Sequence, residues 1–149
     1  MIISTKGRYG LRAMFELAKA YGEGPLSIKQ ISSMQALSEQ YLEQIFSKLK
    51  NAGLVESTRG AGGGYRLGAE PGGISVGMIL TALEGELAPA GCVGEDAECE
   101  NIGLCTTHII WQRVYEGING VVNGITLQDM VDDYKRLLKE KPQAKDVRC

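Results

Sequence analysis

A glycine-rich hairpin constrains the possible fold of this chain more than any other stretch of its 149 residues. Residues 54–57 and 65–67 each predict a short strand, and the tip between them, 59–64, holds one arginine and four glycines. Two short helices are predicted directly before this hairpin, and a helix-turn-helix followed by a hairpin is a winged helix. Glycines let a backbone lie close to a partner, and a lone arginine on such a tip can enter a narrow minor groove of DNA. Arg59 and Gly60 are therefore candidate DNA contacts.

The two helices before the hairpin are indicated by their starting residues. Ser27 and Gln30 form a capping box at the start of a helix over about 27–33. Ser38 begins a second helix, about 38–50, whose apolar residues recur at i, i+3, i+4 and i+7. The other side of this helix carries hydroxyl, amide and carboxylate groups, which base edges in a major groove require. A solvated helix face is the alternative interpretation. The candidate contacts are Ser38, Tyr41, Glu43 and Gln44.

Three of the four cysteines and the only histidine lie close together, in the pattern C-x6-C-x5-C-x2-H. Thiolate and imidazole are the ligands that soft and borderline metals and iron–sulfur clusters select. We call residues 89–105 the cysteine loop. It is acidic and has no hydrophobic pattern, so we expect binding of a cofactor to order it. The candidate ligands are Cys92, Cys99, Cys105 and His108.

Three other interpretations of the cysteine loop stay open at this point. A redox-active thiol pair would use the same residues. Zinc is a second possibility, although zinc sites usually contain C-x2–4-C knuckles and this chain has none. An enzyme could pair a cysteine nucleophile with His108 as base, but His108 has no evident partner to orient it. The protein is therefore expected not to be an enzyme.

The C-terminal part of the chain predicts two further helices. The first, about 105–122, has a wider apolar surface than one small domain covers, and such a helix usually pairs with its copy in a symmetric dimer. Cys105 and His108 stand three residues apart on its first turn, so both can face one site. The second helix, about 126–140, begins at the capping residue Thr126.

The predicted fold class is mainly α with a small β-hairpin wing, that is, a winged helix-turn-helix with a long C-terminal dimerisation helix. Cys149 is expected to be a free surface thiol. In chain order we predict a DNA-binding domain over 1–70, a connecting helix over 71–88, a cluster-binding loop over 89–105, dimerisation helices over 105–141 and a flexible tail over 142–149.

The composition fits this organisation. Residues 1–70 hold nine Lys/Arg against six Asp/Glu, and residues 71–149 hold seven against twelve. A mildly basic first half favours a phosphate-facing surface, although plain solvation accounts for the same counts. The first residues do not form a signal peptide, and no stretch resembles a membrane span. We expect a cytoplasmic protein, where thiols stay reduced and clustered cysteines indicate metal or redox ligands.

The chain resembles a known family, the IscR-type iron–sulfur cluster regulators, which are bacterial dimeric winged-helix transcription regulators. The resemblance covers nearly the whole chain to about residue 138. It departs from the family in the first gap of the cysteine loop, which is usually C-x5-C and is C-x6-C here. The matching segments are 4–9, 37–46, 55–65, the cysteine loop and 125–127.

The resemblance implies a cofactor, a set of site residues and a function. It implies a homodimer through the long helix, operator DNA as partner, and control of cluster-biogenesis genes. It also implies a [2Fe-2S] cluster held by Cys92, Cys99, Cys105 and His108. Related members sense nitric oxide, and others have lost the cluster and regulate cysteine metabolism. The implied DNA contacts are Ser38, Tyr41, Gln44 and Arg59, with Glu43 selecting between two operator classes.

Overall fold

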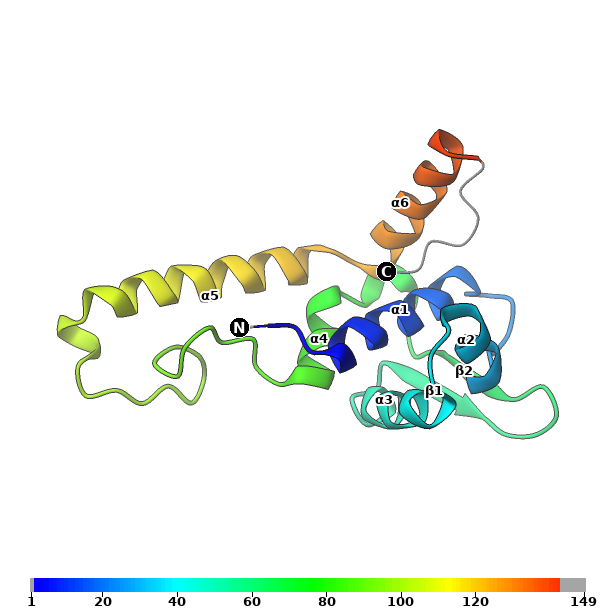
Figure 1. Cartoon of the computed structure of the whole chain (residues 1–149), viewed down its shortest axis with the longest axis horizontal. Helices are drawn as coiled ribbons and strands as arrows, with labels where there is room; N and C mark the ends of the chain where they lie inside the picture. The colour runs from blue at the N-terminus through cyan, green and yellow to red at the C-terminus, as the bar shows by residue number, and fades with distance from the viewer. Residues whose placement is uncertain (1, 143–149) are drawn as a thin grey trace.

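The computed structural model describes residues 2–142 and shows a mainly helical chain with one two-stranded antiparallel hairpin (Figure 1). The predicted fold class is confirmed. The predicted tail beyond residue 142, with Cys149, lies outside the described residues. The elements are α1 (Thr5–Lys19), α2 (Ile28–Gln35), α3 (Glu39–Asn51), β1 (Val55–Thr58), β2 (Gly64–Leu67), the 3₁₀ turn η1 (Pro71–Gly73), α4 (Val76–Glu84), the 3₁₀ turn η2 (Ile102–Leu104), α5 (Thr106–Gly124) and α6 (Leu127–Glu140).

Side-chain caps determine where these helices begin. Five of the six α-helices in the described chain start after a serine or threonine whose side chain accepts a backbone N–H of the first turn. Such a cap satisfies one of the donors that a helix N-terminus leaves unpaired. The exception is α5, which starts after Cys105 with no side-chain cap. The capping residues are Ser4, Ser27, Ser38, Ser75 and Thr126.

A single large core joins the helix-turn-helix, the wing, α4 and α6. Phe46 of α3 is fully buried and stacks on Tyr65 of β2, with ring centroids 4.6 Å apart. Leu127 and Val131 place α6 in the same core, against α1. We call α1–α4, the wing and α6 the winged-helix body. Other fully buried side chains of this core are Met14, Ile31, Leu42, Ile45, Leu49, Ile74, Ile79 and Leu83.

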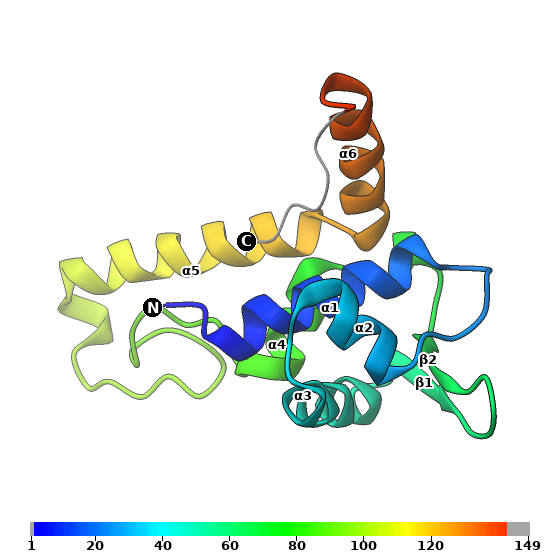
Figure 2. The ribbon, with the colours of Figure 1, turned by 45° about the vertical axis from the view of Figure 1, so that its right-hand side comes forward.

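Backbone hydrogen bonds fix the root of the wing. Leu26, in the segment before α2, exchanges two backbone hydrogen bonds with Tyr65, at 2.9 and 2.7 Å. Gly64 makes this pairing possible, because a Cβ there would collide with the carbonyl oxygen of Leu26. The wing is therefore held to the helix-turn-helix at its base, and only its tip extends away (Figure 2).

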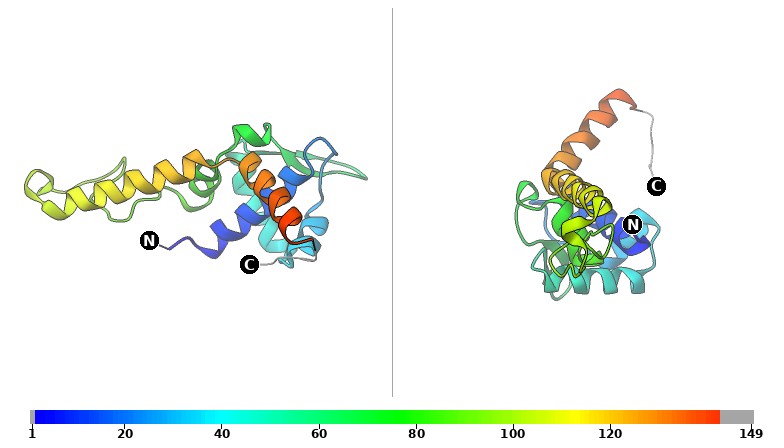
Figure 3. Two further views of the ribbon diagram at one scale, coloured as in Figure 1. Left: turned by 90° about the horizontal axis from the view of Figure 1, so that it is seen from above. Right: turned by 90° about the vertical axis from the view of Figure 1, so that its left-hand side faces the viewer.

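The long helix α5 extends away from the winged-helix body together with the cysteine loop (Figure 3). None of its 19 residues is buried. It is attached near its C-terminal end, where Ile118 and Val122 pack against Val76 and Leu80 of α4. We call α5 and the cysteine loop the arm. No helix within residues 2–142 is long and apolar enough to cross a membrane.

Two details of the arm differ from the sequence prediction. The helix runs two residues further than expected, so Asn123 and Gly124 belong to α5, and Cys105 precedes the helix instead of lying in its first turn. The cysteine loop has no hydrophobic pattern in the sequence, yet part of it is packed: Val93 is 3% exposed, and Leu87, just before the loop, is 4% exposed. Leu87 packs with Val76 and Leu80, so the entry to the loop is anchored on α4.

Candidate nucleic-acid interface and cysteine loop

Helix α3 presents one buried and one exposed side, as a recognition helix requires. Glu43 and Gln44 are exposed, whereas Leu42 and Ile45 beside them are completely buried. Ser38 stands in front of the helix, and its hydroxyl accepts the backbone N–H of Tyr41 at 3.3 Å. The front of this helix therefore offers a hydroxyl, a carboxylate and an amide on a surface that a major groove can accommodate.

Tyr41 has a packing role that the sequence did not reveal. Its ring is half-buried and meets the ring of Tyr9 edge to face, with centroids 6.0 Å apart and planes at 86°. The guanidinium of Arg12 lies 5.4 Å from the centre of the Tyr9 ring. Tyr41 thus braces α3 against α1, and only part of its side chain is free for a partner.

The wing tip is built for close approach. Arg59 and Gly60 are both exposed, and Gly60 has a φ of +103°, which other residues rarely adopt. Gly63 leaves no room for a side chain, because a Cβ there would collide with the carbonyl oxygen of Thr58. The tip is therefore a narrow glycine turn that carries one cationic side chain.

Lysines extend this surface beyond the predicted residues. The Lys6 ammonium, on the first turn of α1, lowers the pKa of Lys48 on α3 because the two cations stand side by side. Lys50 donates to the hydroxyl of Ser57 on β1 at 2.7 Å. The contribution of Lys6 could not be predicted from the sequence, because it depends on the packing of α1 against α3.

A polar network fixes the turn of the helix-turn-helix. Arg12 of α1 donates to the side-chain oxygen of Gln35 at 2.8 Å and to its backbone carbonyl at 2.9 Å. Gln35 in turn donates to Glu16, which Lys19 also pairs at 2.9 Å. Within residues 2–142, Glu16 is the one charged residue that is buried. Because buried charge needs such partners, the network holds the end of α2, and so the start of α3, firmly against α1.

The cysteine loop places its candidate ligands unequally. Cys92 and Cys105 are half-buried, and Cys99 is exposed. Within residues 2–142, no three Cys, His, Asp or Glu side chains stand where they could hold one metal ion. The Thr107 hydroxyl, 3.1 Å from the sulfur, and the backbone N–H of His108 lower the pKa of Cys105. These hydrogen bonds stabilise the thiolate form of Cys105 relative to the thiol, and the thiolate is the form that binds metals.

The chemistry of these side chains fits an iron–sulfur cluster. Nδ1 of His108 is buried and has no hydrogen-bond partner, which is costly for a polar atom unless something else satisfies it. His108 lies on the first turn of α5, where no side-chain cap is present and where the helix dipole favours negative charge. Three thiols and one imidazole can ligate an iron–sulfur cluster. To bind one together, Cys92 and Cys99 would have to move, with the loop, toward Cys105 and His108.

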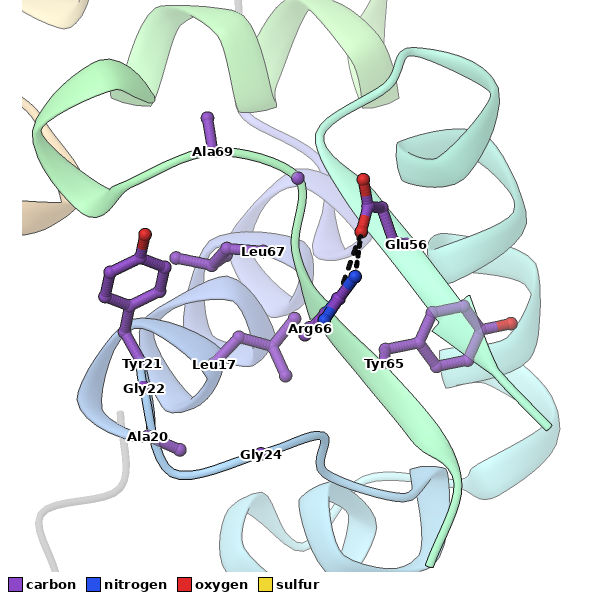
Figure 4. A pocket seen from close by; sticks show the side chains of 11 residues that line it. Leu17, Ala20, Tyr21, Gly22, Gly24, Glu56, Tyr65, Arg66, Leu67 and Ala69 are labelled. Atoms are coloured by element: carbon purple, nitrogen blue, oxygen red, sulfur yellow. Dashed lines mark hydrogen bonds and ion pairs between the residues drawn. The ribbon is translucent and has the colours of Figure 1, made fainter. Parts of the chain in front are cut away.

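A surface hollow lies elsewhere, between the end of α1 and β2 (Figure 4). Its volume is about 470 Å³, and Leu17, Tyr21 and Leu67 form part of its lining. Arg66 and Glu56 form an ion pair of 2.8 Å across the two strands at its edge. None of the candidate DNA contacts or cysteine ligands lines it, so this hollow is separate from both sites.

The Rrf2 family model, described as an iron-dependent transcriptional regulator, matches residues 3–133. This chain belongs to the Rrf2 family. The transcriptional regulator CymR of Bacillus subtilis is 49% identical over 130 residues, covering 87% of this chain and 89% of CymR. IscR of Serratia proteamaculans is 39% identical over 148 residues, covering 99% of this chain and 90% of IscR.

Solved structures of Rrf2 proteins share the fold. CymR, described as the global cysteine regulator of B. subtilis, aligns with a TM-score of 0.74 at 48% identity, covering 89% of this chain and 97% of CymR. IscR of T. potens aligns with a TM-score of 0.74 at 42% identity, covering 99% of this chain and 94% of that protein. An oxidized form of Staphylococcus aureus CymR aligns with a TM-score of 0.70 at 39% identity, covering 87% and 95%.

Membership of the Rrf2 family establishes the general activity. The chain is a DNA-binding transcription regulator and not an enzyme, because its relatives and its fold are those of helix-turn-helix regulators. The expected resemblance to IscR-type regulators is confirmed. CymR proteins are as similar to this chain as IscR proteins are, so the signal that it senses has to be argued from its own residues.

Proposed function

We propose that this protein is a homodimeric, cytoplasmic regulator that senses iron–sulfur cluster status and controls cluster-biogenesis genes. It would hold a [2Fe-2S] cluster through Cys92, Cys99, Cys105 and His108. The observation that carries the proposal is the buried, unpartnered Nδ1 of His108, on the helix turn that directly follows Cys105. A bound cluster would supply iron and a redox centre that oxidants can attack.

The chain's own residues would do three things in this function. The uncapped start of α5 favours the negative charge of a thiolate-ligated cluster. The exposed Cys99 and the half-buried Cys92 leave the loop free to close on Cys105. Closure of the loop would then couple cluster occupancy to its folding, because the ligands are brought together only when a cofactor holds them.

A second copy of the chain would cover α5. Its exposed apolar side chains include Ile110, Trp111 and Val114, which are 51%, 41% and 39% exposed. A row of this kind on a helix without buried residues is typical of an isologous dimer interface. Pairing through α5 would bring two winged-helix bodies together in one dimer, so that each could bind one half-site of the same operator.

DNA would be read by α3 and the wing. Ser38, Gln44 and part of Tyr41 would enter the major groove, and Arg59 with Gly60 the minor groove. Glu43 would select between operators, because a carboxylate accepts from cytosine but repels other acceptors and phosphate. It is exposed on the reading side of α3, where it can do so.

The experiment that tests this function is anaerobic purification with iron and sulfide analysis. Two irons and two sulfides per chain and a red-brown colour are expected for a [2Fe-2S] protein. A matched series, Cys92→Ser, Cys99→Ser and Cys105→Ser, should lose the colour, whereas Ser33→Ala on exposed α2 should keep it. Affinity for the promoter of the protein's own operon is then compared with and without the cluster. Colourless, iron-free wild-type protein would refute the cluster.

Thiol redox sensing is the second candidate function, and two observations favour it. The Thr107 hydroxyl and the backbone N–H of His108 lower the pKa of Cys105, which favours the thiolate, the form that reacts with oxidants. The similarity to CymR, of which an oxidized form has been solved, extends over most of the chain. Iron-free protein whose DNA affinity changes on oxidation and recovers on reduction would support this function in place of the first.

A further inference from the structure

The junction between α4 and the cysteine loop consists of two glutamates separated by a glycine. We call Glu84, Gly85 and Glu86 the junction. Helix α4 ends at Glu84, and Gly85 follows with a φ of +80°, a conformation that side chains rarely permit. The turn at Gly85 lets the two carboxylates bind different parts of the molecule, and both partners are close to functional segments.

Glu84 binds the start of α1. One of its carboxylate oxygens accepts the backbone N–H of Ser4 at 2.9 Å, the hydroxyl of Ser4 at 2.5 Å and the backbone N–H of Gly7 at 3.0 Å. A residue other than glycine at position 7 would collide with this oxygen. An anion at a helix N-terminus is stabilised by the unpaired N–H groups there, so Glu84 fixes the first turn of the winged-helix body.

Glu86 binds the arm. Its Oε1 accepts the hydroxyl of Tyr115, on α5, at 2.6 Å and the backbone N–H of Glu95, in the cysteine loop, at 2.8 Å. Gly94 again leaves the necessary space, because a Cβ there would collide with the same carboxylate. Glu95 lies between Cys92 and Cys99 in the chain. Glu86 therefore joins the middle of the cysteine loop to the long helix.

We propose that Glu86 and Tyr115 are positioning residues that fix the cysteine loop against α5, and that the junction transmits the state of the loop to the first turn of α1. This inference deepens the proposed function, since it explains how a change near Cys92 and Cys99 reaches the DNA-reading surface. Neither residue is a ligand or a DNA contact. Glu86 binds the backbone N–H of Glu95, and Tyr115 acts through the carboxylate of Glu86.

The route beyond the junction consists of contacts already described. Glu84 binds the first turn of α1, and Arg12 of the same helix binds Gln35 at the end of α2, directly before the turn that leads to α3. A shift of the first turn of α1 would thus move the support of the recognition helix. Contact alone does not prove coupling, so the test measures whether a change at one end alters the other.

The first test uses hydrogen exchange on cluster-free protein, which makes it independent of the proposed function. Tyr115→Phe removes one hydroxyl and keeps the ring, and Tyr21→Phe, at an exposed position, is the matched control. Exchange in 92–99 and also in 4–8 should become about fivefold faster in Tyr115→Phe, as for the loss of one ordinary hydrogen bond. Glu86→Ala should have the larger effect, with Glu86→Gln between the two.

Three outcomes distinguish the parts of this proposal. Unchanged exchange in 92–99 in both Tyr115→Phe and Glu86→Ala would overturn the positioning role. Faster exchange in 92–99 with unchanged exchange in 4–8 would overturn the transmission. Faster exchange in both segments supports the proposal even if the wild-type protein proves to be iron-free, an outcome that refutes only the proposed cofactor.

The second test applies to cluster-loaded protein. Tyr115→Phe should keep the full iron content and the visible spectrum of the wild-type protein. The ratio of operator affinities with and without cluster should move toward one, by about fivefold, since the loop no longer acts on α1. A wild-type ratio in a variant with full iron content would contradict the transmission.

Discussion

The winged-helix body and the arm solve the problem of burying apolar surface in opposite ways. Helix α1, with 15 residues, buries seven of them, whereas α5, with 19, buries none. The start of α1 is satisfied by Ser4 and Glu84, and the start of α5 has no side-chain cap. The body thus contains the partners that its side chains need. The arm exposes apolar and polar groups that a second copy and a cofactor would satisfy.

The largest expected effect is a loss of folding stability from a substitution in the core of the winged-helix body, far from the candidate ligands in the arm. Phe46→Ala removes a fully buried ring that stacks on Tyr65, and it should lower the free energy of unfolding by about 3–5 kcal/mol. Urea denaturation followed by circular dichroism measures this. Trp111→Ala on the exposed side of α5 is the comparison, and it should cost the isolated chain much less.

The next largest effect is on dimerisation and leaves the folding of the single chain intact. Ile110→Glu places a charge on the apolar side of α5, and the dissociation constant of the proposed dimer should rise roughly 100-fold, as for an unpaired charge in an interface. Light scattering after size exclusion measures the mass, and circular dichroism should show a folded chain. Glu116→Lys, at an exposed position elsewhere on α5, is the control. A dimer that survives Ile110→Glu would place the interface elsewhere.

Operator choice comes third. Glu43→Ala should raise affinity for the disfavoured operator roughly tenfold while affinity for the preferred one stays similar, because a repulsive carboxylate is lost. Fluorescence anisotropy with two operator duplexes, with and without the cluster, provides the ratio. If the ratio of the two operator affinities is the same in wild type and variant, Glu43 does not select between operators.

A smaller effect tests the lysines that packing brings to the DNA surface. Lys6→Gln should reduce the slope of log affinity against log salt concentration by about one, as for one lost phosphate contact. Lys139→Gln, on the outer end of α6, is the control and should leave the slope unchanged. The same slope in wild type and Lys6→Gln would mean that Lys6 lies outside the interface.

The smallest effect concerns the cap of α6 and its dependence on pH. The backbone N–H and hydroxyl of Thr126 lower the pKa of Asp129 below its usual range. Because the folded-state pKa is the lower one, this contribution to stability is present above the unfolded-state pKa and disappears as pH falls through the folded-state value. Asp129→Asn should therefore lower the melting temperature slightly at pH 7, and the difference should vanish in strong acid.

The sequence predicted the body well because its signals are local. Caps such as Ser27, Ser38 and Thr126 and the apolar repeat of α3 depend on residues a few positions apart, so they can be read without a structure. The separate apolar residues Leu87 and Val93 form no repeat, and their burial was missed. The hydrogen bond between Glu86 and Tyr115 could not be predicted either, since only the packing of the arm brings them together.

One close approach between helices sets the mechanics of the whole molecule. At Gly77 of α4 a side chain would collide with Asn123, so the last turn of α5 touches the backbone of α4 directly. Helix α5 as a whole, with 19 residues, is roughly 28 Å long at the usual rise per residue. Because its apolar packing on α4 lies near its C-terminal end, this helix can act as a lever. A small rotation of α5 about its contact with Gly77 would move its N-terminal end, where Cys105 and His108 lie, by a larger distance. A displacement of that end would in turn rotate the C-terminal end of α5 against α4.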